Sequence, residues 1–229
     1  RLDDQAGQRR NVVGDGEVYE QWVDHYFNPL SLFSASIPSY VAIGNHEKDA
    51  HWFYDYLSQP HPENYFAFSW GDARFVIVDS NVQYDRNSPQ GKFIENEVNS
   101  YVYQSAKWRF FFWHHPPYSE QWDSEGYTGT FLVEQFLLPQ ITNANVDILF
   151  VGHTHDYERG YIDQGDGMAY IITGGGGAAL DYVYNWDWEE VSVYASEYHH
   201  MTVDLTENKA IVRAVRLDGS ELDRFEIDH

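Results

Sequence analysis

The stretch FVGHTHDYERG, residues 150–160, places two histidines one residue apart directly after an apolar run. The run VDILF (146–150) is short and mostly apolar, which predicts a buried strand. Gly152 follows it, and a glycine lets the backbone turn sharply out of a strand. We therefore expect His153 and His155 at the carboxyl end of a core strand, where both imidazoles can point toward one site.

Two other apolar runs end in side chains that can bind a metal ion. VAIG is followed by NHE (45–47), and FFFW is followed by HHPP (114–117). Loops beyond the carboxyl ends of strands converge in α/β sheets, so we expect the three groups to meet. Imidazole nitrogen, amide oxygen and carboxylate together suit zinc, iron or manganese. A single histidine at the end of a strand is usually structural. Three strands in one chain that each end in potential ligands predict a metal site.

The bulk composition argues against several classes of protein. Hydrophobic residues make up 43% of the 229 residues, which is ample for a core. There is no cysteine, so disulfides, a thiolate nucleophile and a cysteine zinc cluster are excluded. The net charge of −22 disfavours binding to nucleic acid and to anionic membranes. No apolar run is long enough to predict a membrane span.

Alternating helical and strand patterns predict one α/β domain over residues 1–229. The expected helices lie at 17–27, ending before Asn28-Pro29, and at 93–105 and 130–141. The expected strands lie at 39–44, 108–113, 146–153 and 168–177, with a hairpin over 65–80 turning at Gly71-Asp72 and a terminal meander over 198–205, 209–217 and 221–228. We expect the strands to pack in two layers with helices outside. Because the sequence opens on a polar segment without methionine, we expect its N-terminus to be truncated.

Three motifs together resemble the calcineurin-like metallophosphoesterase superfamily, and within it the purple-acid-phosphatase-like branch. They are GNHE (44–47), HHPPY (114–118) and GHTHDYER (152–159), in the order and with the spacing of that family. The resemblance implies a four-layer α/β/β/α fold, in which a β-sandwich is flanked by helices. It also implies hydrolysis of a phosphomonoester or small phosphodiester by a hydroxide that bridges two metal ions, of Zn, Fe or Mn.

The resemblance further implies which residues hold the two ions. Asn45, through its amide oxygen, would bind the second ion together with His114 and His153. His155 would face the first ion. His46, directly after the ligating asparagine, would be the acid that stabilises or protonates the leaving oxygen.

Other polar residues near these motifs are expected to support the site. His115 would lie beside the metal ligands and contact the substrate. Residues 156–159 are expected to brace the loop, and the four glycines 174–177 to pass close to the metals. Asp79 and His199 are expected to be structural.

The N-terminal part departs from the family pattern. The family has two aspartates before GNHE, one holding the first ion and one bridging both, but only about ten residues precede VVGD (12–15). Asp15 has the sequence context expected of the bridge, and Asp4 is a candidate metal ligand for either role. Counting back from Trp22 by the family interval reaches Asn11, which cannot bridge as a carboxylate does. We favour Asp15 and keep Asp4 open.

Two functions are compatible with these observations. The first is a metal-dependent phosphoesterase that acts on a small phosphate-ester substrate. We expect it to bind neither nucleic acid nor a membrane. The alternative is a degenerate homologue that has lost one metal site and serves as a binding or structural domain of a larger assembly. Family members closest in pattern are mostly exported, so we expect a secreted or periplasmic protein.

Overall fold

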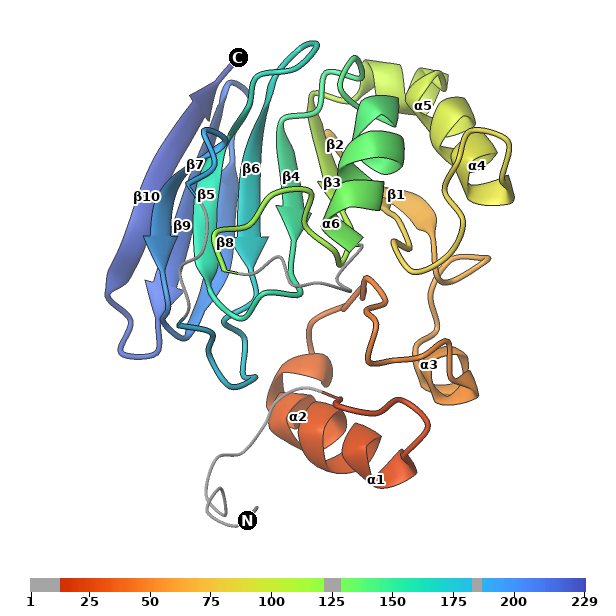
Figure 1. Ribbon diagram of the computed structural model, residues 1–229, viewed down its shortest axis with the longest axis vertical. Coiled ribbons are helices and arrows are strands. Elements are labelled where there is room, and N and C mark those ends of the chain that lie inside the picture. Colours follow the sequence, from red (N-terminus) through yellow and green to blue (C-terminus); the bar gives the residue numbers. More distant parts are fainter. Residues whose placement is uncertain (1–12, 122–128, 183–186) are drawn as a thin grey trace.

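Seven strands form the main sheet of the computed structural model, which describes residues 13–121, 129–182 and 187–229 (Figure 1). The strand order is β1-β2-β3-β4-β6-β5-β7. The strands are β1 (Phe66–Trp70), β2 (Ala73–Ile77), β3 (Trp108–Phe112), β4 (Ile148–Val151), β5 (Tyr157–Ile162), β6 (Met168–Thr173) and β7 (Val191–Ala195). Neighbours among β2, β3, β4 and β6 are parallel, whereas β1, β5 and β7 pair antiparallel. The parallel strands therefore direct their carboxyl ends to one edge of the sheet, where the predicted ligands follow β3 and β4.

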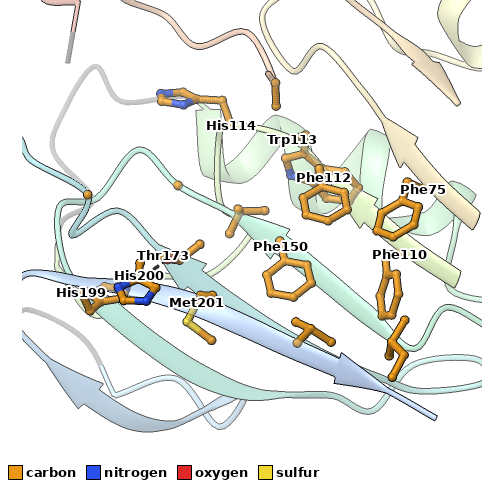
Figure 2. Close-up of a pocket in the computed structure, with 16 residues that line it drawn as sticks. Phe75, Phe110, Phe112, Trp113, His114, Phe150, Thr173, His199, His200 and Met201 are labelled. Atoms are coloured by element: carbon orange, nitrogen blue, oxygen red, sulfur yellow. Dashed lines mark hydrogen bonds between the residues drawn. The ribbon is translucent and has the colours of Figure 1, made fainter. Parts of the chain in front are cut away.

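Three further strands form a second sheet that packs against the first. They are β8 (His199–Leu205), β9 (Lys209–Arg216) and β10 (Glu221–Asp228), in the antiparallel order β10-β9-β8. Side chains alternate between the two faces of a strand, so every second residue of β3 and β4 points toward this sheet. Phe110 and Phe150 accordingly share a core with Val212 and Ala214. Figure 2 shows aromatic residues of this inner face together with a residue of β8: Phe75, Phe110, Phe112, Phe150 and Met201.

Helices cover the opposite face of the seven-stranded sheet, on the side of β1–β4 (Figure 1). They are α4 (Pro89–Val98), α5 (Tyr101–Ser105), α6 (Gly129–Leu132), η2 (Val133–Leu137) and η3 (Leu138–Gln140). Phe111 and Leu149, the alternate residues of β3 and β4, point into this second core and pack with Ile94 and Tyr103 of the helices. The predicted class, a mixed α/β fold with packed sheets and flanking helices, is confirmed. No helix in the described part of the chain is long and apolar enough to cross a membrane.

Two predicted helix boundaries are wrong. The first helix does not stop before Pro29, because α1 (Tyr19–Gln21), the π-helical η1 (Trp22–Phe27) and α2 (Asn28–Ser34) follow one another without a break. Pro29 is the second residue of α2, directly after the π-helical segment η1. The helix expected over 93–105 divides, because the Ser100 hydroxyl accepts the N–H of Tyr103 (3.1 Å) and caps a new helix, α5.

The strand predicted over 39–44 is also wrong, because a side chain satisfies the backbone there instead of a neighbouring strand. The N–H of Val41 donates to Gln59 Oε1 (2.6 Å), and Gln59 Nε2 donates to the carbonyl of Val41 (3.2 Å). Ile43 packs with Trp22 and Phe53 in a small core between the N-terminal helices and α3 (His51–Tyr56). The segment thus enters the site as a braced loop.

Candidate metal centre

The pairing of β3 with β4 brings two of the predicted histidines side by side. Phe112 of β3 lies opposite Phe150 of β4. The pairing continues beyond the formal strands, since the N–H of Gly152 donates to the carbonyl of His114 (3.0 Å). His114 and His153 therefore leave the sheet next to each other.

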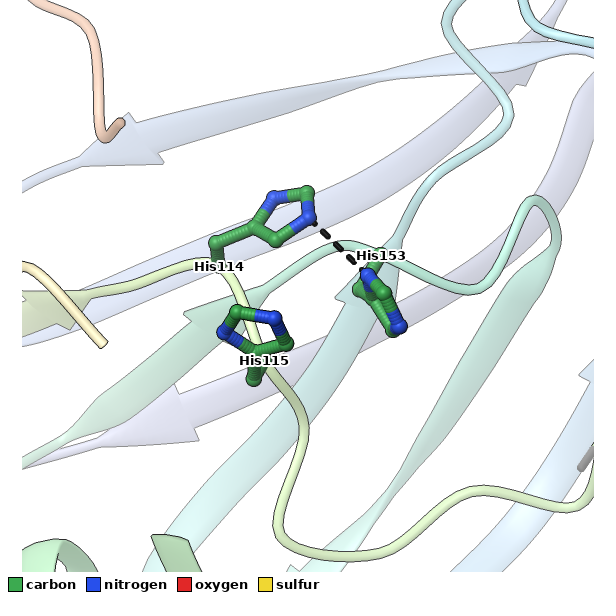
Figure 3. Close-up of side chains that lie close together, drawn as sticks. All are labelled: His114, His115 and His153. Carbon is green, nitrogen blue, oxygen red and sulfur yellow. Dashed lines mark hydrogen bonds between the residues drawn. The ribbon is translucent and has the colours of Figure 1, made fainter. Parts of the chain in front are cut away.

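Three donor atoms meet at this point, and we call Asn45, His114 and His153 the ligand cluster. His114 Nε2 lies 2.8 Å from Asn45 Oδ1 and 3.0 Å from His153 Nδ1, and His153 Nδ1 lies 3.2 Å from Asn45 Oδ1. Figure 3 shows the imidazoles of His114 and His153 directed at each other. Ligands about 2.0 Å from a tetrahedral zinc ion lie roughly 3.3 Å apart, so the spacing fits three ligands of one ion. Two imidazole nitrogens and an amide oxygen also match the donor types of zinc, iron and manganese.

The backbone around the ligand cluster has two unusual features. His153 has a φ of 74°, in the left-handed region that residues other than glycine rarely occupy. Such strained residues concentrate at functional sites, where the surrounding structure holds them. At Gly44 a Cβ atom would lie 2.8 Å from the ring of His114 and 2.8 Å from the carboxylate of Glu47. Only a glycine lets the chain pass this close to the ligand.

Burial keeps the clustered imidazoles neutral. Desolvation lowers the pKa of His114 well below the usual histidine value, and it lowers the pKa of His153 to about 3. The pKa of His115 falls to about 4 for the same reason. A metal ion binds the neutral ring, so these side chains need not lose a proton at pH 7 in order to ligate.

His46 and His155 line the same cavity as His114 and His153, a space of about 580 Å³. His46 Nδ1 lies 2.9 Å from the carbonyl of Gly14, and His155 Nδ1 lies 2.8 Å from the carbonyl of Ala179. A carbonyl only accepts hydrogen bonds, so each Nδ1 carries the proton. In the neutral ring, Nε2 is then the atom left to bind a metal or exchange a proton.

His115 lies beside the ligand cluster but is buried. Its ring centroid is 4.7 Å from that of His153, and its Nδ1 is 2.8 Å from Ser80 Oγ. Ring nitrogens of His114, His115 and His153 all lie within 4.8 Å of one another. Contact between His115 and a substrate stays a prediction.

Of the two candidate N-terminal ligands, Asp15 and Asp4, the structure describes Asp15, which does not line the cavity that the histidines line. Asp15 Oδ2 accepts from Lys48 Nζ (2.8 Å), and Oδ1 accepts the N–H of Glu17 (3.1 Å). The hydrogen bond from Lys48 holds the pKa of Asp15 below its usual value. Among the described residues that line the cavity, Gly14 is present and Asp15 is not. Asp4 lies outside the described residues.

The residues after His155 lead into β5, and the side chains of this strand are held by neighbouring elements. Tyr157 Oη donates to Asp223 Oδ2 (2.8 Å), and Arg159 Nε pairs with the same oxygen (2.5 Å). Glu158 is fully buried and accepts from Ser119 Oγ (2.8 Å). Among the glycines 174–177, the N–H of Gly174 donates to the carbonyl of Asp156 (2.9 Å), which draws that loop to the cavity wall.

Asp79 and His199 are both hydrogen-bonded to neighbouring residues, and one further residue near the site was not foreseen. Asp79 accepts from the side chains of Asn64 and Asn81, and Asn81 Nδ2 also donates to the carbonyl of Ile43, next to the GNHE loop. His199 bonds to Thr173 Oγ1 (3.1 Å) and to the carbonyl of Glu197 (2.9 Å). Gln59, which braces the loop carrying Asn45, gave no signal in the sequence.

Known proteins resemble this chain in sequence and in fold. The sequence model of the family described as Calcineurin-like phosphoesterase matches residues 11–157. Purple acid phosphatase 13 of Arabidopsis thaliana is 28% identical over 73% of this chain and 34% of its own length. Probable inactive purple acid phosphatase 27 of the same plant is 24% identical over 70% of this chain and 32% of its own length. The chain thus spans about a third of the length of these relatives.

The fold has a counterpart among solved structures. A purple acid phosphatase from seeds of yellow lupin (Lupinus luteus) superposes with a TM-score of 0.62 at 20% identity. The similarity covers 96% of this chain and 39% of the lupin chain. At this level of identity the comparison shows that the two chains share a fold over nearly the whole length of this chain.

Gly44→Ala is expected to disrupt the ligand cluster. The new methyl group would press on the half-buried ring of His114, which its contacts with Asn45 and His153 hold in place. We expect zinc affinity, measured by competition with a chromogenic chelator, to fall at least about tenfold. Gly176→Ala is the control, because a Cβ there meets nothing within 4 Å. Equal losses in both variants would contradict the steric explanation.

Glu158→Gln is expected to change how stability depends on pH. Burial and the neighbouring Asp156 raise the pKa of Glu158, so the folded chain retains a proton that the unfolded chain releases above about pH 4.5. The free energy of unfolding therefore falls as the pH rises through this window. Glutamine keeps the shape but cannot ionise, so the fall between about pH 5 and pH 9 should shrink by roughly 1–3 kcal/mol in urea titrations. Glu134→Gln serves as the control, and parallel curves for wild type and Glu158→Gln would refute the assignment.

Proposed function

The chain belongs to the calcineurin-like phosphoesterase family, and we propose that it hydrolyses a phosphomonoester or small phosphodiester at the ligand cluster. The observation that carries the proposal is the meeting of Asn45 Oδ1, His114 Nε2 and His153 Nδ1 within 3.2 Å. These atoms come from three separate segments, and nothing in the packing of an apolar core requires them to converge.

The ligand cluster would hold one metal ion, and His155 would contribute to a second. Such ions, when bound, polarise a phosphoryl oxygen and supply a water-derived nucleophile at neutral pH. The hydrogen bond from His155 Nδ1 to Ala179 fixes the ring so that Nε2 is the ligating atom. Asp15 would join them as a bridging ligand only after its carboxylate leaves Lys48.

His46 is the proposed acid for the leaving oxygen. Its position directly after Asn45 places it in the wall of the same cavity. The hydrogen bond to the carbonyl of Gly14 orients the ring. Nε2 can then pass a proton to the oxygen of the departing group.

The charge and the family support a proposal for the substrate and for the location. A chain with a net charge of −22 repels polyanions, so we propose a small phosphate ester and not a nucleic acid. We further propose that the protein is secreted or periplasmic, as expected for this branch. Detection of the natural protein only inside the cytoplasm would contradict that location.

The degenerate homologue remains the second candidate. It is favoured by the ion pair that occupies Asp15 and by the similarity to a relative named as a probable inactive phosphatase. The deciding experiment is hydrolysis of para-nitrophenyl phosphate with added zinc, manganese or iron. Turnover that depends on the metal supports the enzyme, whereas metal binding without turnover supports the binding or structural domain.

His46→Ala should lower turnover by about 10²–10⁴ while bound metal stays near the wild-type level. The loss follows because His46 would protonate the leaving oxygen and is not part of the ligand cluster. The assay combines steady-state kinetics with metal analysis of the same preparation. Loss of metal in His46→Ala would show that this histidine is a ligand and not the acid.

The two ions should differ widely in affinity. The ligand cluster offers three side chains, whereas of the first site's predicted ligands in the described part of the chain, His155 lines the cavity and Asp15 does not. We expect one ion per chain to survive dialysis against a weak chelator. His153→Ala should remove it, and His155→Ala should retain it yet lose hydrolysis. Two equally tight ions would instead indicate a complete first site.

A further inference from the structure

His155 is enclosed by residues 179–181, which follow the glycine-rich loop and which we call the clamp segment. The backbone N–H of His155 donates to Asp181 Oδ2 (2.9 Å), and the backbone N–H of Asp181 donates to the carbonyl of His155 (3.1 Å). The ring nitrogen Nδ1 of His155 lies 2.8 Å from the carbonyl of Ala179. The clamp segment therefore holds both the backbone and the ring of His155.

The side chain of Asp181 joins the clamp segment to the histidine. His155 lies in the connection between β4 and β5, outside both strands, and the Asp181 carboxylate accepts its backbone N–H. The same oxygen, Oδ2, lies 3.9 Å from Nδ1 of the ring. An anionic oxygen beside Nδ1 favours the tautomer that carries its proton there, as does the carbonyl of Ala179. Nε2 is then the unprotonated atom.

The clamp segment is itself anchored to neighbouring elements. The carbonyl of Asp181 accepts from Gln121 Nε2 (3.3 Å) and from the hydroxyl of Ser196, which directly follows β7. At the start of the glycine-rich loop, a Cβ on Gly174 would lie 1.7 Å from the carbonyl oxygen of Thr154. The loop therefore packs against the His155 connection at one end and holds it through Asp181 at the other.

His155 needs such support because it is not enclosed by a core. Its side chain is 34% exposed, and that of Asp181 is 31% exposed. A half-exposed imidazole can adopt several rotamers and both neutral tautomers. Partners that select one orientation before a ligand arrives raise the affinity for a metal ion.

We propose that Asp181 is a positioning residue for His155, which keeps Nε2 free of its proton and directed at the first ion. The inference rests on the proposed function, in which His155 binds that ion. His155 and Ala179 are among the described residues that line the cavity, and Asp181 is not. Asp181 therefore acts through the histidine, without touching the metal or the substrate.

The first test observes the His155 ring in the metal-free chain. Nuclear magnetic resonance of isotope-labelled histidine, at about pH 8 where an imidazole is neutral, distinguishes the two tautomers. Wild type should show the Nδ1–H form. Asp181→Ala should show a mixture of both forms, because the clamp segment has lost its hold on the backbone N–H of His155. Asp181→Asn should restore the Nδ1–H form, since its side-chain oxygen can still accept that N–H.

The second test follows the metal. Asp181→Ala should weaken the less tightly bound zinc ion about 10–100-fold in calorimetric titrations and leave the ion at the ligand cluster in place. The kcat for para-nitrophenyl phosphate should fall with it, and Asp181→Asn should restore both quantities. Asp163→Ala is the matched control, because it removes the same charge from an exposed position just beyond the far end of β5.

Thermal melting establishes that the variants fold. Asp181→Ser, whose side chain is too short to reach the N–H of His155, replaces Asp181→Ala if the alanine variant does not fold. An unchanged tautomer in Asp181→Ala would overturn the inference, and so would an equal loss in Asp181→Asn. A tautomer shift in a chain that hydrolyses no phosphate ester would refute the proposed function and leave the positioning of His155 by Asp181 intact.

Discussion

The parallel pairing of β3 with β4 is the constraint on which the candidate site depends. It places His114 and His153 on neighbouring chains at the same edge of the sheet, and the bond between Gly152 and His114 continues the pairing to the ligands themselves. Both strands are held from two sides, because Phe110 and Phe150 face the second sheet while Phe111 and Leu149 face the helices. The positions of His114 and His153 are thus fixed by the two hydrophobic cores on either face of β3 and β4, although neither histidine belongs to these cores.

Burial gives the ligand cluster its chemical character. Removing an imidazole from water disfavours its charged form, which is why the pKa values of His114 and His153 are low. The folded chain therefore keeps lone pairs available over a wide pH range, and it holds them at mutual distances near those of ligands around one ion. The packing around His114 contributes both to the stability of the fold and to the affinity for a metal ion. A methyl group at Gly44, which would press on this ring, is therefore expected to lower both.

The sequence predicted the helices and strands that have a clear local pattern. It did not predict segments whose conformation depends on residues far away along the chain. The hairpin at Gly71, the strands β3, β4 and β6, and the terminal meander all follow from period and turn residues, and the positions of His114 and His153 follow from β3 and β4. The strand expected at 39–44 is a loop because Gln59, far along the chain, satisfies its backbone. β5 was missed because its charged residues look like a loop, although Glu158 is buried and Arg159 is paired. Asp15 could not be placed, since only the structure shows the ion pair with Lys48.

Electrostatics would link the proposed binding of metal to the proposed binding of phosphate. The overall charge of −22 opposes the approach of a phosphate ester, and the neutral imidazoles of the ligand cluster do not offset it. Lys48, a cation close to the N-terminal loop, is bound by Asp15. A cation held by Asn45, His114 and His153 would oppose this field and make the cavity attractive to an anion. By reciprocity, a bound phosphate must then raise the affinity for the metal by the same factor, so the two ligands are expected to bind cooperatively.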